Sequence, residues 1–472
     1  MQLLRALGFF HVNMLLLSAT LGTGIFVTPK GALKYSSLNI PVFLSIWAGC
    51  GMLAIMNALC LAEMAATYPV SGASYYFLRR TLGSSVAFLS VWIKLFSHFS
   101  GIGSLCLLIA SSLIQCFYYG CPAPELATKC LALAVLWSVG ILNARGIKTV
   151  AWFNTISSFI KLSVLCLISL TGIVLLVIGK KENVSRFENA LDAELPNVSQ
   201  IADAILQVYY SYLGSSILII LAGEIKRPTE TIPKTLIYGL CFVTVLYLLT
   251  NISYLTVLTS TEIISSDSVG VTWMNRVFPS IQWIISLLIS AVLLDSASCG
   301  IASASRVFYS ASQGGQLPLI YSMLNDHHSP VIAVIQIVIL SSVAIISSNI
   351  IYLVKYVSLG AWCLNVLHMI ALLKLRYQNP DLPRPYKVWL PFIFGSIASS
   401  LFLIFTPVIQ SPSVQHVYQV VFLFCGLLCY WFQANLNRHA VCFDTITCYC
   451  QLLFNVSPSE DQEKLIPSLN PA

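Results

Sequence analysis

Long apolar runs recur along almost the whole chain, and short polar segments separate them. Each run is close to the ~20 residues that an α-helix needs to cross a hydrocarbon core of ~30 Å. The pattern therefore predicts twelve membrane-spanning helices. Their expected ranges are 9–33, 39–67, 82–116, 129–145, 151–178, 200–223, 234–257, 281–310, 330–350, 352–376, 389–409 and 414–436.

Composition places the chain among polytopic membrane proteins. Of its 472 residues, 57% are hydrophobic and 9% are charged, whereas an ordinary soluble domain has about 25% charged residues. The first apolar run is too long for a cleaved signal peptide, and a second run follows it closely. The predicted fold class is an all-α membrane protein with short termini at 1–8 and 437–472. The C-terminal tail has a polar end and is expected to be disordered.

The net charge of +7 is a signal of topology. With the N-terminus placed in the cytoplasm, most lysines and arginines fall in cytoplasmic loops, which predicts that both termini are cytoplasmic. Nucleic acid is therefore not an expected partner. The GTGIFV stretch at 22–27 departs from the dinucleotide-binding pattern G-x-G-x-x-G. Because the sequence has no Ser/His/Asp arrangement and no metal-ligand cluster at suitable spacing, we expect no cofactor, no metal and no enzymatic activity.

The loop 179–199 lies outside in this topology. It carries two N-glycosylation sequons, at Asn183 and Asn197. Both are expected to be accessible to glycosylation in an extracellular loop.

Most of the fifteen cysteines stand singly in apolar runs and are expected to be small packing residues. Three call for separate interpretation. Cys121 falls in an outside loop, where it can bond either a second chain or a neighbour, Cys116 or Cys130. In the cytoplasmic tail, Cys448 and Cys450 are expected to be free thiols or palmitoylation sites.

The first apolar run contains a break, SATLGTGIFVTPKG at 18–31, in which Gly22 and Gly24 bracket Thr23. Each glycine inside a helix costs roughly 1 kcal/mol relative to alanine. A break at this depth exposes backbone N–H groups at the start of the following half-helix, where a carboxylate can bind. The carbonyl groups that end the preceding half-helix can accept from an ammonium. The break therefore predicts a site for a free amino acid, and close helix packing through small residues is the alternative.

A second break interrupts the sixth run, where VYYSYLGSSILIILAGE spans 208–224. Paired breaks in the first helices of two five-helix halves indicate an inverted-repeat transporter. The repeats would be 9–178 and 200–376, with 377–436 appended after them. This arrangement predicts an alternating-access carrier with its substrate at the middle of the membrane. A non-transporting membrane sensor or scaffold is the alternative from another functional class.

Six motifs, in order and over almost the whole chain, resemble those of the light chains of the heteromeric amino-acid transporters. They are GTGIFVTPKG, AEMAATYPVSGASYYFL, GCPAPEL, AGEIKRPTETIPK, SASRVFYSASQGGQLP and RPYKVWLP. These light chains belong to the amino acid–polyamine–organocation superfamily. The resemblance implies the LeuT-like fold, a 5+5 inverted repeat with discontinuous helices 1 and 6. Further stretches, GKKENVSRFENALDAELP, NISYLTVLT and TCYCQLLFN, are similar to the branch that holds an aspartate/glutamate transporter and an aromatic-preferring amino-acid transporter; the second is favoured.

The resemblance implies a role for residues at both breaks. Those implied to hold the substrate carboxylate are Gly22, Thr23, Gly24 and Ile25. Those implied to offer carbonyl groups to the substrate ammonium are Thr20, Tyr210 and Leu213. Tyr210 takes the position of an aromatic lid over the bound side chain.

Lys161 in the fifth apolar run matches a lysine whose ammonium occupies a site that binds sodium elsewhere in the superfamily. The resemblance therefore implies sodium-independent transport. Physical reasoning agrees that Lys161 should face a cavity or a partner, because a charge at that depth in a membrane is costly. Snorkelling of the side chain to the membrane surface is the alternative.

Cys121 matches the half-cystine that bonds a single-span glycoprotein heavy chain, so the resemblance implies an rBAT-like partner. The implied location is the plasma membrane, with both termini in the cytoplasm and the apical membrane of epithelial cells as a candidate. The expected partners are thus L-amino acids, the heavy chain and the lipid bilayer.

Departures from the family pattern bear on the substrate. Many light chains have tyrosine, two glycines and tryptophan where this chain has Tyr212, Leu213, Gly214 and Ser215. Serine in place of tryptophan removes most of a large side chain and would enlarge the site. Asp295 stands where relatives carry small residues. If it faces the site ionised, it repels acidic side chains; a protonated or hydrogen-bonded acid at a helix interface is the alternative.

The expected substrates are neutral, preferentially aromatic L-amino acids. The alternative set is aspartate, glutamate and cystine, as in the other member of the branch. Obligatory exchange and facilitated diffusion both fit the sequence.

Overall fold

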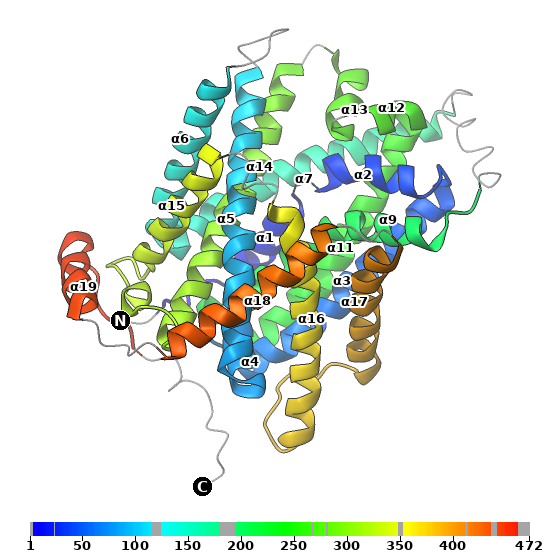
Figure 1. The fold of residues 1–472 in the computed structure, drawn as a ribbon. Helices are drawn as coiled ribbons and strands as arrows, with labels where there is room; N and C mark the ends of the chain where they lie inside the picture. The colour runs from blue at the N-terminus through cyan, green and yellow to red at the C-terminus, as the bar shows by residue number, and fades with distance from the viewer. Residues whose placement is uncertain are drawn as a thin grey trace.

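The structure is a computed structural model that describes residues 3–22, 24–115, 124–179, 194–266, 268–279, 282–347, 353–410, 414–435 and 441–460. Over these ranges the chain forms α-helices and short 3-10 helices, and no strand (Figure 1). Each predicted apolar run coincides with one helix or with a pair of helices separated by a break.

The helices follow one another with short connections. In the first half they are α1 (Phe9–Thr20), α2 (Gly24–Tyr35), α3 (Ile40–Thr67), α4 (Ala73–Leu82), α5 (Ser84–Gln115), α6 (Glu125–Ala144) and α7 (Ile147–Val177). In the second they are α9 (Val198–Tyr210), η1 (Leu213–Ser216), α10 (Ile217–Ile220), η2 (Ala222–Glu224), α11 (Pro228–Val257), α12 (Ser260–Ser265), α13 (Val269–Val277), α14 (Gln282–Gln313), η4 (Leu319–Ser322), α15 (Val331–Ser347) and α16 (Leu353–Gln378). The chain ends with α17 (Leu390–Gln410), α18 (Val414–Asn435) and α19 (Val441–Phe454).

Length and composition show which helices could cross a membrane. Among the described residues, five qualify singly: α3, α5, α6, α7 and α11. Two bent pairs bring the number to seven, because α1 and α2 meet at 44° and α9 meets the η1–α10 segment at 51°. Helices α15, α17 and α18 are apolar but contribute shorter stretches. The chain is thus an all-helical multi-pass membrane protein, and twelve crossings remain a prediction.

The order of helices in the first half recurs in the second. Each half begins with a broken pair, followed by a long helix of 28 residues in α3 and 30 in α11. Short helices then lead to α5 and α14, each of 32 residues. The next two helices have 20 and 31 residues in the first half, and 17 and 26 in the second. Corresponding helices also pack together, α3 on α11 and α5 on α14.

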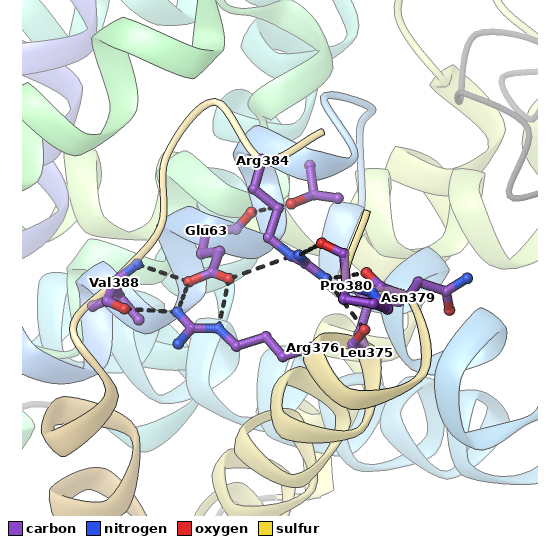
Figure 2. A network of polar contacts seen from close by, with 8 residues as sticks. Glu63, Leu375, Arg376, Asn379, Pro380, Arg384 and Val388 are labelled. Atoms are coloured by element: carbon purple, nitrogen blue, oxygen red, sulfur yellow. Dashed lines mark hydrogen bonds and ion pairs between the residues drawn. The ribbon is translucent and has the colours of Figure 1, made fainter. Parts of the chain in front are cut away.

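A buried carboxylate ties α3 to α16 and to the segment before α17 (Figure 2). Glu63 accepts from Arg376 Nε at 3.0 Å, from Arg376 Nη2, and from the backbone N–H of Val388 at 2.8 Å. Arg384 lies 3.9 Å from the same carboxylate and donates to the carbonyl of Asn379 at 2.7 Å. Since all these contacts converge on one acid, Glu63 holds three segments in a fixed arrangement.

A second buried ion pair lies at the end of the second broken helix, which runs from α9 to η2. Glu224 and Arg306 are both fully buried and form two parallel bonds, of 2.9 and 3.1 Å. The backbone beside Glu224 also pairs with the N-terminal segment, because Leu7 N donates to its carbonyl at 3.0 Å and Lys226 N donates to the carbonyl of Leu7 at 2.8 Å. The segment before α1 is therefore attached to the end of the second broken helix.

The expectation of a disordered tail is wrong for residues 441–460. This segment forms α19, and Ser457 then exchanges two backbone hydrogen bonds with Leu324, of 2.9 and 3.0 Å. The physical reason is that 441–454 is rich in apolar residues, two of which, Cys450 and Phe454, pack on an apolar cluster after α14. The polar end that suggested disorder begins only after this helix.

Candidate functional site

The two breaks lie directly against each other. At Gly214 in η1, a Cβ atom would collide with the carbonyl of Ala19 and stand 2.6 Å from the backbone nitrogen of Thr20. At Gly24, a Cβ atom would stand 2.7 Å from the Cα of Ser211. The absence of side chains at both positions lets the backbones approach. We call this meeting of residues 18–22, 24 and 25 with residues 209–216 the junction.

A tyrosine from a third helix joins the two sides of the junction. The hydroxyl of Tyr247, on α11, lies 2.7 Å from the carbonyl oxygen of Thr20 and 3.2 Å from that of Ser211. Its ring is fully buried and packs on Trp47 and Tyr212, with ring centroids 5.5 and 5.3 Å away. Because a hydroxyl has one proton, the two carbonyl groups compete for the same donor.

The Thr20 carbonyl accepts two bonds in this arrangement. Besides Tyr247, the backbone N–H of Gly22 donates to it at 2.8 Å. On the other side of the break, Thr28 donates to the carbonyl of Gly24 at 2.9 Å and lies 3.1 Å from the Ser211 hydroxyl. The broken ends are therefore held by polar side chains as well as by close packing.

Lys161 and Asp295 form a buried ion pair beside the first break. The distance from Lys161 Nζ to Asp295 Oδ2 is 2.8 Å, and the side chains are 2% and 0% exposed. The same ammonium donates to the carbonyl of Ser18 at 2.7 Å, and the Ser18 hydroxyl donates to Asp295 Oδ2 at 2.5 Å. The three residues come from α7, α14 and α1, so they link three helices at one point.

The second Asp295 oxygen, Oδ1, is buried and has no hydrogen-bond partner in the part of the chain that the structure describes. Nearby, Cys299 lies 3.4 Å from the Ser18 hydroxyl and accepts from Asn154 at 3.3 Å. The acid therefore lies at an interface between helices, with its charge directed at Lys161.

The second break presents part of its surface outward. Tyr210 is 57% exposed and Leu213 is 49% exposed, while Ser215 is half-buried. Tyr212, between them, is instead buried and donates to the carbonyl of Trp47 at 3.3 Å. The break thus has one side built into the core and one side that is open.

The structure brings together most of the residues predicted from the sequence. Thr20, Gly22, Gly24 and Ile25 lie on the first side of the junction, and Tyr210, Leu213, Gly214 and Ser215 lie on the second. Thr23, Cys121 and Asn183 lie outside the described residues. Asn197 is exposed and is the N-cap residue of α9, where it forms a capping box with Gln200. Cys448 is exposed and Cys450 is half-buried on α19.

Two residues that form the site were not predicted from the sequence. Ser18 and Tyr247 are ordinary residues inside apolar runs, and nothing in their spacing marks them. A tyrosine inside a membrane helix does suggest a hydrogen bond, but its partners lie far away along the chain. Among the described residues, no group of three or more His, Cys, Asp or Glu side chains stands close enough to hold a metal ion.

Membrane helices with paired breaks that meet at one point are typical of inverted-repeat carriers. The amino acid permease family model matches residues 7–432, and the chain belongs to that family. It is 84% identical over 464 residues to solute carrier family 7 member 12 of Mus musculus, covering 98% of this chain and 99% of the relative. It is 47% identical over 455 residues to solute carrier family 7 member 13 of Homo sapiens, covering 96% and 97%.

A more distant relative is the b(0,+)-type amino acid transporter 1 of Homo sapiens, 30% identical over 466 residues, or 98% of this chain and 94% of the relative. Together these matches make the chain a light chain of the heteromeric amino-acid transporters. Its relatives are solute carriers, so the protein is a carrier and not an enzyme.

Proposed function

We propose that the protein transports neutral L-amino acids across the plasma membrane without sodium, with a preference for aromatic ones. It would do so by alternating access in a twelve-helix, LeuT-like 5+5 arrangement. The recurring order of helices in the two halves supports this layout, and so does the pairing of corresponding helices. The single observation that carries the proposal is the junction, where two half-helix starts and two half-helix ends meet.

The two poles of an amino acid fit the two kinds of backbone group at the junction. The first turn of α2 offers N–H groups that have no partner within the helix, together with the positive end of its dipole. We propose that the substrate carboxylate binds there, on Thr23, Gly24 and the amide of Ile25. The Gly22 amide would join them when it leaves the Thr20 carbonyl, to which it donates at 2.8 Å. The ends of α1 and α9 offer carbonyl groups, which suit the ammonium.

Tyr247 occupies one of the carbonyl groups proposed for the substrate ammonium. Since the Thr20 carbonyl already accepts two bonds, an arriving ammonium has to displace one donor. The Tyr247 hydroxyl can turn so that its O–H group donates to the carbonyl of Ser211, which lies 3.2 Å away. The substrate would then take the freed position on Thr20, with the carbonyls of Tyr210 and Leu213 completing its contacts.

The charges around the site favour a neutral side chain. Asp295 is paired with Lys161, so neither offers a free charge to the substrate. We therefore propose that Asp295 acts by holding Lys161. An acidic side chain would lose its hydration without gaining a partner, at a cost of several kcal/mol. An aromatic side chain could stack on the exposed side of the Tyr210 ring, beside the small Ser215. Such stacking contributes about 1 kcal/mol beyond burial.

Lys161 accounts for sodium independence. Its ammonium donates to the carbonyl of Ser18 at 2.7 Å. The positive charge beside the break is therefore supplied by the protein, and no sodium ion is needed there. A covalent heavy chain bonded through Cys121, glycosylation at Asn183 and Asn197, and cytoplasmic termini belong to the same proposal.

Uptake into proteoliposomes tests the proposal. Labelled phenylalanine uptake should be equal in sodium and choline media, and unlabelled phenylalanine should abolish it. Alanine should compete less well, and glutamate should barely compete. Strict sodium dependence would overturn the cation role of Lys161. Stronger competition by glutamate, or by alanine, would replace the aromatic preference with an acidic or a small neutral one.

A further inference from the structure

Helix α19 has two different faces. Cys450 and Phe454 pack against a small apolar cluster formed by η4, the segment after it and the start of α15. On the opposite face, Tyr449, Leu452 and Leu453 are 70%, 78% and 77% exposed. These three positions share one side of the helix, because Leu452 and Leu453 follow Tyr449 by three and four residues, about one turn. In the part of α19 whose side chains the structure describes, the outward face is therefore apolar and exposed.

The orientation of this face is fixed by the residues that follow the helix. Ser457 exchanges two backbone hydrogen bonds with Leu324. The Asn455 side chain donates to Asp326 at 3.0 Å, and Gln313 at the end of α14 donates to the Ser459 hydroxyl at 2.8 Å. With its C-terminal side attached at these points, α19 cannot roll to hide its apolar face.

Helix α19 lies beside a helix whose outer side is apolar. In Figure 1, α19 stands at the side of the helix bundle, beside the lower part of α15. The outer side of α15 exposes Ile339, Val343 and Ile346, which in a membrane protein face lipid. The cluster on which α19 packs includes Ile332 at the start of α15, and the three exposed residues follow Ile332 on the same side of that helix. Helix α19 therefore packs at the end of the lipid-facing side of α15.

We propose that α19 is a membrane-surface helix, whose Tyr449, Leu452 and Leu453 side chains lie in the lipid leaflet on the side of the termini. That leaflet is the cytoplasmic one in the topology of the proposed function, on which this detail rests. Large apolar side chains gain free energy by leaving water. A helix that lies in the interface buries one such face at the boundary of headgroups and acyl chains, and tyrosine is enriched at that depth.

Site-specific photo-crosslinking in vesicles of phosphatidylcholine and phosphatidylserine tests the proposal. The photo-reactive residue p-benzoylphenylalanine replaces Leu452 in the full chain, and mass spectrometry identifies what it captures. Val343 on α15 serves as the lipid-facing control position, and the exposed Asp381 between α16 and α17 serves as the water-facing one. Phospholipid adducts should form at Leu452 and Val343 but not at Asp381.

A second variant separates lipid contact from chance capture. With the photo-reactive residue at Tyr449, the double change Leu452→Asp and Leu453→Asp should abolish the phospholipid adduct, because the face no longer enters the leaflet. The adduct at Val343 should persist in that background. Capture of another protein at Leu452, or no lipid adduct there while Val343 forms one, would overturn the proposal. Neither readout requires transport, so a failure of uptake would count against the proposed function alone.

Discussion

Replacing Asp295 with asparagine tests the buried ion pair directly. The change removes the carboxylate that stands 2.8 Å from Lys161, where both side chains are almost fully buried. Breaking a buried pair by removing one partner costs about 3–5 kcal/mol, because the other charge stays buried without a counter-charge. We expect a loss near 3 kcal/mol in the free energy of unfolding, since asparagine keeps one oxygen that can accept from the ammonium.

A matched surface change provides the control. Glu230 lies 3.9 Å from Lys234, and both side chains are more than half exposed. Glu230→Gln should therefore cost less than about 1 kcal/mol. Both variants are purified in the same detergent, and their free energies of unfolding are compared with that of the unchanged protein. If Asp295→Asn costs no more than Glu230→Gln, the pair does not stabilise the protein as the structure indicates.

The double change Lys161→Met and Asp295→Leu then separates a structural pair from a cation site. Two apolar side chains in place of a buried pair often leave stability unchanged, so stability should recover. Uptake of labelled phenylalanine should stay low, because the carbonyl of Ser18 no longer has a cation. Recovery of uptake along with stability would mean that Lys161 has only a structural role.

Three further changes test other parts of the structure. Tyr247→Phe removes the donor that the carbonyl groups of Thr20 and Ser211 share, and should cost about 1–3 kcal/mol in unfolding free energy. Tyr254→Phe on the same helix should cost little, because that hydroxyl has no partner among the described residues. Equal losses in the two variants would refute the bridging role of Tyr247. Glu63→Gln should lower the thermal midpoint, since the Arg376 guanidinium loses its buried acid, and an unchanged midpoint would contradict the network in Figure 2. Cys121→Ser should abolish a thiol-sensitive heterodimer on non-reducing gels, and a wild-type chain that runs as a monomer there would exclude the bridge.

The helical framework was predictable from hydrophobic pattern alone. A span such as α7 is a long, predominantly apolar run in spite of Lys161 near its middle, and the length of the run sets the length of the helix. The breaks were predictable too, because Gly22 and Gly24 bracket Thr23 in the middle of an apolar run, where glycine weakens a helix. Local sequence thus indicated which segments would be irregular.

The contacts at the junction, and those in the ion pair beside it, could not be predicted in the same way. Lys161 and Asp295 lie on different helices, and no spacing rule relates them. The sequence showed only that each charge needed a partner, and the fold decides that they partner each other. Tyr247 illustrates the same limit, because its two acceptors belong to two separate breaks.

The tail was misjudged for a different reason. Its polar end dominated the interpretation, although the preceding segment contains closely spaced apolar residues such as Leu452, Leu453 and Phe454. A helix of this length has no strong signature unless its surroundings are known, since it needs a surface on which to pack.

Equilibrium binding of labelled phenylalanine to the purified protein, without sodium, tests most directly whether the junction is the amino-acid site. Gly24→Val places a side chain against the Ser211 backbone, where a Cβ atom would already stand 2.7 Å from Cα. Gly49→Val on α3 is the matched control, because a Cβ atom there meets nothing within 4 Å. Binding should be lost in Gly24→Val, even where the variant elutes as a folded protein, and should be kept in Gly49→Val. Unchanged binding by a folded Gly24→Val protein would contradict the account.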